Sequence, residues 1–199
     1  YFESISLVPK LRETRAFVGF SRLEPEQRTI SDCKKELRLG TTEDWLPAIE
    51  VFGEGIFFKF DAEKLQKWAK IPSVQKRISK LNTAYHKARF GADSVGDLRP
   101  EYVLIHTFAH LIINQLSFDC GYGSSSIRER IYCERSSNDL NMYGLLIYTA
   151  SGDSEGSLGG LVRQGEAGRL EDTIVSAIEN ASWCTSDPIC IQSAGQGPE

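Results

Sequence analysis

The sequence predicts an α+β fold, because strand-like and helix-like patterns occupy separate stretches of the chain. Residues 1–60 mostly alternate apolar and polar side chains, as half-buried strands do. Residues 61–118 change to helical spacing, two strand-like runs follow, and helical patterns return towards residue 183. This grouping favours α+β over the strand-helix alternation of a parallel sheet.

The strands are expected in two groups. "SISLV" and "RAFVGFSRL" are predicted as N-terminal antiparallel strands that bracket "PKLRET". "WLPAIEVFGEGIFFKF" is predicted to form a hairpin that turns at Gly53, Glu54 and Gly55, since glycine permits the positive φ of a tight turn. "IRERIYCE" and "YGLLIYTAS" are predicted as adjacent, hairpin-like strands, and the nearly all-apolar second run as a central strand.

Five helices are expected, over residues 61–70, 73–90, 101–118, 157–165 and 170–183. Asp61 is a natural N-cap for the first, and Pro72 ends it. The first two form an amphipathic, basic pair. The third is apolar nearly all round, so it is predicted to be a buried central helix that ends at Gly121. The last two are the C-terminal helices.

Composition places the chain among ordinary soluble proteins. No apolar run approaches the roughly 18 residues that a membrane span requires, and the first residues lack the pattern of a signal peptide. The five cysteines are an odd number at scattered positions, which argues against a disulfide framework and for a reducing compartment. We therefore expect a cytoplasmic protein, and the absence of an initiator Met indicates a fragment of a larger one.

Charge is unevenly distributed. Net charge is −2 over residues 1–58, +6 over 59–99 and −8 over 100–199. The basic middle is predicted to contact the phosphates of DNA, although a lysine-rich helix face is also typical of a solvated surface. The candidate phosphate contacts are Lys64, Lys67, Lys70, Lys76, Arg77 and Lys80.

A G-x-S-x-G motif at residues 152–156 raises the alternative of a serine hydrolase or nuclease. It lies between a predicted strand and a predicted helix, as the nucleophile elbow of an α/β-hydrolase does. In that fold the general base His follows the Ser, whereas His86, His106 and His110 all precede Ser154. The glycines can equally form a tight turn, with Ser154 or Ser157 capping the next helix.

His106 and His110 are four residues apart on one predicted helix face, and Asn114 extends the stripe. The spacing suits two metal ligands, but Thr107 stands where the catalytic Glu of H-E-x-x-H would be, so a metalloprotease is not expected. The other interpretation is a structural hydrogen-bonded network of the two histidines. Its candidate partners on the following strand are Arg128, Glu129 and Arg130.

The cysteines divide into two groups. Cys33, Cys120 and Cys133 are isolated and are expected to be small core residues. Cys184 and Cys190 lie close together in a polar, turn-like loop, which leaves core, redox and metal interpretations open. A structural zinc site usually has four Cys or His ligands, and this pair supplies two.

Five segments together resemble a known family: "WLPAIEVFGEGIFFKF", "HTFAHLIINQL", "GYGSSSIRERIY", "GLLIYTASGDSEGSLGGLV" and "ASWCTSDPIC". They are similar to the C-terminal helicase-associated domain of the DrmB subunits of DISARM anti-phage defence systems. They are less closely similar to the zinc-binding (MZB) domain of MrfA-type helicases. The resemblance extends over most of the chain.

The resemblance implies a noncatalytic accessory domain that docks a partner helicase and assists DNA binding. ATP hydrolysis would belong to that partner, in agreement with the lack of a G-x-x-x-x-G-K-[ST] loop here. It also implies zinc held by Cys184, Cys190 and further cysteines downstream, so the site is expected to be incomplete in a chain ending at residue 199. The expected organisation is mainly strands over 1–60, basic helices over 61–95 and the helicase-associated domain over 98–190.

Overall fold

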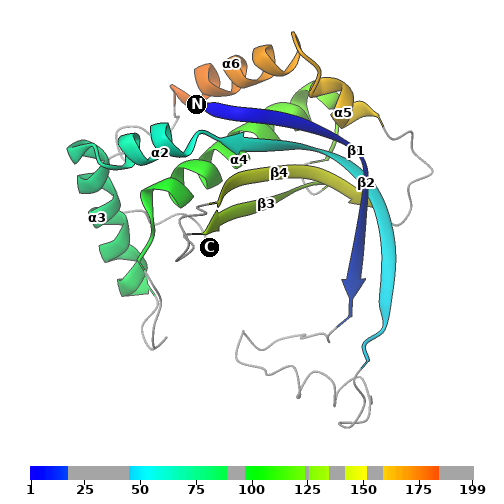
Figure 1. Ribbon diagram of the computed structural model, residues 1–199, viewed down its shortest axis with the longest axis horizontal. Coiled ribbons are helices and arrows are strands. Elements are labelled where there is room, and N and C mark those ends of the chain that lie inside the picture. The colour runs from blue at the N-terminus through cyan, green and yellow to red at the C-terminus, as the bar shows by residue number, and fades with distance from the viewer. Residues whose placement is uncertain (18–44, 89–96, 124–125, 135–141, 152–158, 184–199) are drawn as a thin grey trace.

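The computed structural model describes residues 1–17, 45–88, 97–123, 126–134, 142–151 and 159–183 (Figure 1). In these residues it has a four-stranded antiparallel sheet in the order β1-β2-β4-β3. The strands are β1 (Phe2–Ala16), β2 (Ala48–Phe60), β3 (Ile127–Glu134) and β4 (Met142–Ser151). The α+β class is confirmed, as are the pairing of the last two strands and the central place of β4.

The N-terminal strand is longer than predicted. β1 continues through "PKLRET" and pairs with β2 from Phe2 opposite Phe60 to Ala16 opposite Ala48. The register shifts between Val8 and Leu11, around Pro9. Proline lacks an N–H, so a strand accommodates it at an edge or at an irregularity, and β1 offers both. The expected break between two short strands is therefore wrong.

The predicted hairpin at residues 53–55 is also wrong, because β2 continues through both glycines. The reason lies in the neighbouring strand. A Cβ on Gly55 would lie 2.7 Å from the carbonyl oxygen of Ile147 on β4, closer than real atoms approach. Glycine in this strand thus allows two backbones to pack closely and does not form a turn.

The helices agree with the sequence pattern. They are α2 (Ala62–Ala69), α3 (Pro72–Ala88), α4 (Pro100–Cys120), α5 (Gly160–Gln164) and α6 (Leu170–Ala181). The Asp61 side chain caps α2 by accepting a hydrogen bond of 3.0 Å from the Lys64 backbone N–H. α4 ends at Gly121, whose φ of 69° is in the left-handed region that favours glycine.

The core lies between α4 and one face of the sheet (Figure 1). Ile56 and Phe58 of β2, with Leu145 and Ile147 of β4, are fully buried there. α4 contributes Ile105, Ala109, Ile112 and Leu116, while α5 and α6 add Leu161, Leu170 and Ala177. In Figure 1, α4, α5 and α6 all lie on this side of the sheet.

α4 is central, but it is not buried on all sides. The Phe118 side chain is 84% exposed, and Tyr102, His110 and Asn114 also face solvent. A helix that packs on one face of a sheet leaves its outer side uncovered unless other elements cover it. Apolar residues on all sides of a helix are therefore not sufficient for full burial, and the prediction of a buried helix is corrected to a half-covered one.

Among the described helices, none combines the length and the apolar character that a membrane crossing needs. The division of the chain at residues 1–60, 61–95 and 98–190 stays a prediction.

Candidate metal centre and basic surface

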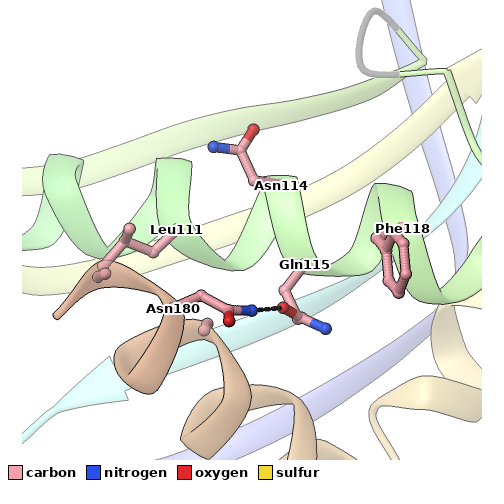
Figure 2. A pocket seen from close by; sticks show the side chains of 7 residues that line it. Leu111, Asn114, Gln115, Phe118 and Asn180 are labelled. Atoms are coloured by element: carbon pink, nitrogen blue, oxygen red, sulfur yellow. Dashed lines mark hydrogen bonds between the residues drawn. The ribbon is translucent and has the colours of Figure 1, made fainter. Parts of the chain in front are cut away.

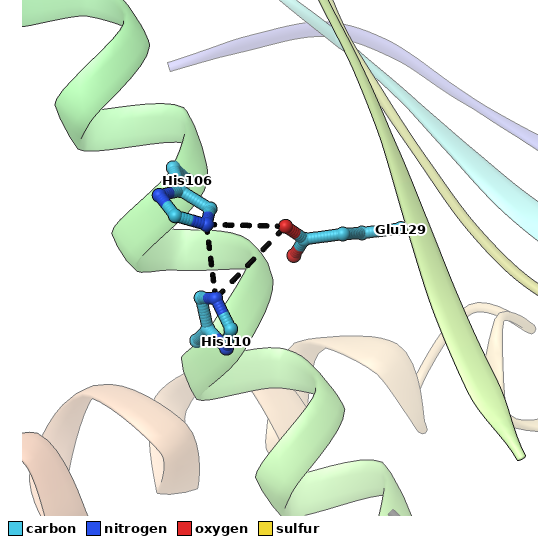
Figure 3. A group of neighbouring side chains, drawn as sticks. All are labelled: His106, His110 and Glu129. Atoms are coloured by element: carbon cyan, nitrogen blue, oxygen red, sulfur yellow. Dashed lines mark hydrogen bonds and ion pairs between the residues drawn. The ribbon is translucent and has the colours of Figure 1, made fainter. Parts of the chain in front are cut away.

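A cluster of two histidines and one glutamate forms where α4 passes β3. His106 and His110 are one helical turn apart on α4, so their rings point to the same side (Figure 3). Glu129 projects towards them from β3. Helix periodicity and the packing of α4 against β3 together produce the cluster.

The polar atoms of the three side chains converge. The two histidine Nε2 atoms are 3.0 Å apart. Glu129 Oε1 lies 3.2 Å from His106 Nε2 and 3.9 Å from His110 Nε2. The side chains are partly open to solvent, with 43% exposure for His106, 60% for His110 and 23% for Glu129. The predicted pairing of the histidines is present, at the surface of the helix.

The direction of Glu129 follows from strand geometry. Successive side chains alternate between the two faces of a sheet, and Ile127 and Cys133, of the same parity as Glu129, are buried on the α4 side. Arg128 and Arg130 therefore face the other way. Arg128 Nη1 lies 3.9 Å from Glu13 Oε1, and the Arg130 guanidinium lies over the Tyr132 ring.

The predicted structural network is corrected accordingly. Of its three candidate partners on β3, Glu129 lies beside His106 and His110, whereas Arg128 and Arg130 point to the opposite face of the sheet. The sequence indicates Glu129 only as one of three candidate partners of the histidines. The sequence signal is the position of Glu129 in the alternating run "IRERIYC". It stands midway between Ile127 and Ile131, at a position where the alternation would place an apolar, core-facing side chain.

The cluster offers two imidazole nitrogens and one carboxylate oxygen, all within 4.8 Å of one another. These are ligands that first-row divalent cations prefer. In the part of the chain that the structure describes, this is the one group of three or more His, Cys, Asp or Glu side chains in such proximity. Thr107 replaces the glutamate that serves as general base in H-E-x-x-H peptidases.

The six predicted phosphate contacts all lie on the exposed faces of α2 and α3 or directly after α2. Lys64 and Lys67 form ion pairs within their own segment, to Asp61 at 3.2 Å and to Glu63 at 3.8 Å. The remaining four have no recorded carboxylate partner among the described residues: Lys70, Lys76, Arg77 and Lys80. Whether this surface contacts DNA stays a prediction.

Aromatic side chains contribute little to this basic surface. Trp68 packs against the hydrophobic core with Leu65 and Phe108 nearby. Tyr85 is half-buried on α3. The surface is therefore one of point charges, which suits contacts with the phosphate backbone better than base stacking.

Several predicted motif residues lie outside the described part of the chain. They are the zinc candidates Cys184 and Cys190, the G-x-S-x-G motif around Ser154, and Cys33. Cys133 is buried in the core, and burial raises the pKa of the Cys120 thiol. Cys133 is the small core residue that the sequence predicted.

A shallow groove of 380 Å³ runs between α4 and α6 (Figure 2). A hydrogen bond of 3.0 Å from Asn180 Nδ2 to Gln115 Oε1 links the two helices at this groove. Leu111 and the strongly exposed Phe118 give its walls an apolar character. Asn114, which extends the stripe of His106 and His110 along α4, also lines this groove.

Two comparisons with known proteins bear on the family. Residues 108–195 match the family model described as the MrfA Zn-binding domain, MZB. The chain is 42% identical, over 96% of its length, to the DISARM protein DrmB of Bacillus paralicheniformis. It spans 34% of the length of that relative. The resemblance to DrmB is therefore confirmed, and residues 108–195 are similar to the MrfA Zn-binding domain.

Proposed function

We propose that this chain is a noncatalytic, helicase-associated domain of a bacterial anti-phage defence protein, which docks a partner helicase in the cytoplasm and assists DNA binding. The observation that carries the proposal is the 42% identity to a DISARM DrmB protein across nearly the whole chain. The match to a zinc-binding domain named after MrfA supports it independently.

The basic surface supports the DNA-binding part of the proposal. α3 buries Ile78, while Lys76, Arg77 and Lys80 lie on the exposed face. Since no described carboxylate neutralises these charges, they are available for phosphate groups. Lysine and arginine displace condensed counterions from DNA whatever its sequence, so this surface suits non-specific binding.

The sequence of this chain agrees with the proposal that a partner helicase hydrolyses ATP. No phosphate-binding G-x-x-x-x-G-K-[ST] loop occurs in the 199 residues. ATP hydrolysis in a helicase complex would then belong to another module or subunit. This chain would contribute a folded accessory surface.

Fluorescence anisotropy with labelled single- and double-stranded DNA tests the surface. The test variant is Lys76→Gln/Lys80→Gln on α3. The matched control is Arg163→Gln/Arg169→Gln, which makes the same charge change at exposed positions on α5 and before α6. We expect weaker binding and a smaller dependence on salt for the α3 variant, by about one unit of slope per lost phosphate contact. The control should bind like the unmodified chain.

Equal affinities of the two variants would contradict the α3 surface, and binding that is insensitive to salt would contradict phosphate recognition altogether. Docking is tested separately by co-purification of the helicase of the same defence system with tagged chain. Assembly with unchanged DNA affinity in the α3 variant would favour a purely structural module.

A further inference from the structure

We propose that His106, His110 and Glu129 bind one divalent first-row transition metal ion, with zinc the best fit. This site is defined by these three side chains and does not include Cys184 and Cys190, which lie outside the described residues. It depends on neither DNA binding nor helicase docking, so its test is independent of the proposed function.

Distances between the donor atoms carry the inference. Zinc bonds of about 2.0–2.2 Å at tetrahedral angles place neighbouring ligand atoms about 3.3–3.6 Å apart. The three distances of 3.0, 3.2 and 3.9 Å lie around this value. These separations are compatible with three corners of a distorted tetrahedron.

The hydrogen-bonding state of the cluster also favours an ion. Two Nε2 atoms 3.0 Å apart can share one N–H hydrogen between them. Neither ring then donates a hydrogen bond to Glu129 Oε1. The second carboxylate oxygen, Glu129 Oε2, is buried and has no hydrogen-bond partner in the described part of the chain. A bound cation would satisfy the nitrogen lone pairs and the carboxylate charge together.

The surroundings suit a cation. Arg128 and Arg130 flank Glu129 in sequence, but they point to the opposite face of the sheet. The histidines are 43% and 60% exposed, which gives an ion access from solvent and leaves the fourth position to water. The ligands also belong to a regular helix and a regular strand. These two elements are linked by a hydrogen bond that the Arg99 guanidinium, at the start of α4, donates to the Cys133 carbonyl on β3.

The identity of the donors distinguishes this site from a cysteine site. Its ligands are two nitrogens and one oxygen, whereas Cys184 and Cys190 would supply sulfur. A metal that reports on its ligands can therefore separate the two. Cobalt(II) substitutes for zinc, and thiolate ligands add a charge-transfer absorption that nitrogen and oxygen ligands lack.

The experiment uses the whole chain with Cys184→Ser and Cys190→Ser as the parent, titrated with zinc by calorimetry. We expect one zinc ion per chain. His110→Gln and Glu129→Gln should each weaken zinc binding more than about tenfold, since even loss of an outer contact to a ligand costs that much. The control is His86→Gln, which removes the third histidine at its exposed pair with Asp97, and it should leave zinc affinity unchanged.

Two readouts keep the test decisive. Zinc should raise the melting temperature of the parent and of His86→Gln but not of His110→Gln, because only a folded binding site couples the ion to stability. Cobalt(II) should give a tetrahedral spectrum without thiolate charge transfer. If the serine parent does not fold, the same variants are compared in the unmodified chain, where His110→Gln should lower the zinc content by one. Equal zinc binding by His110→Gln and His86→Gln would overturn the proposal.

Discussion

Gly55 and Gly144 allow the neighbours of two central strands to pack closely, because neither residue has a Cβ. At Gly55 the atom that an added Cβ would meet is the backbone oxygen of Ile147, at 2.7 Å, with Tyr148 Cβ at 3.0 Å. At Gly144 it is the end of the Phe57 ring, at 2.8 Å. A backbone carbonyl within a ladder has little freedom to move, whereas a half-buried ring can rotate.

Gly55→Ala should therefore destabilise the protein more than Gly144→Ala. Overpacking a well-filled site costs about 1–3 kcal/mol, and we expect Gly55→Ala in that range. Gly144→Ala should cost less, because the Phe57 ring can shift along the open sheet face. Urea unfolding followed by circular dichroism gives both free energies. Equal losses of unfolding free energy in the two variants would show that the strands separate as readily as the Phe57 ring moves.

Among the helices and strands, the start of α2 is the place where a single residue, the N-cap Asp61, most directly explains the structure. The Asp61 carboxylate accepts the Lys64 backbone N–H at 3.0 Å and lies 3.2 Å from the Lys64 ammonium. The hydrogen bond to the Lys64 backbone N–H is the main cause that lowers the pKa of Asp61 below its usual 3.8. A lowered pKa in the folded state means that the ionised form stabilises folding.

We expect Asp61→Ala to lower the melting temperature at neutral pH, because one helix N–H loses its acceptor. Asp61→Asn keeps a cap without the charge, and it serves as the control. The advantage of the wild type over Asp61→Asn should be complete above about pH 4 and disappear as pH falls through the lowered pKa. Thermal melts from pH 2 to 7 measure it. An advantage that persists at the lowest pH would contradict the role of the carboxylate charge.

At the scale of the whole molecule, the sheet has two different faces. α4, α5 and α6 cover one face, and the core lies beneath them (Figure 1). On the other face, Phe57 meets Tyr132 edge to face, Arg130 lies over Tyr132, and Tyr148 donates to Glu13. Among the described residues, no helix packs over these side chains (Figure 1). Adjacent residues of β4 therefore contribute unequally to stability.

Leu145 and Leu146 test this asymmetry. Leu145 is fully buried under the helices, whereas Leu146 is half-buried on the opposite face. We expect Leu145→Ala to cost about 2–5 kcal/mol, through lost apolar contacts and a cavity. Leu146→Ala should cost about 1 kcal/mol, the typical effect of a single substitution. Equal costs in chemical denaturation would contradict a sheet with one covered face.

Local patterns were sufficient for the helices and for the last two strands. Asp61, Pro72 and Gly121 mark helix boundaries by capping and backbone chemistry that act within a few residues. The alternation of "IRERIYCE" likewise predicts β3 and indicates which side of it faces the core. These signals can be read from the sequence because each involves only near neighbours in the chain.

The sequence by itself determined the α+β class, the helix positions, the four-residue spacing of His106 and His110, and the family to which the chain is similar. Only the tertiary structure decided that Gly55 lies within a strand, that α4 exposes one side, and that Glu129 meets the histidines while Arg128 and Arg130 do not. The physical reason is the same in each case. These features depend on contacts between strands and helices that are distant along the chain. The periodicity of a segment does not specify which other strand or helix will pack against it.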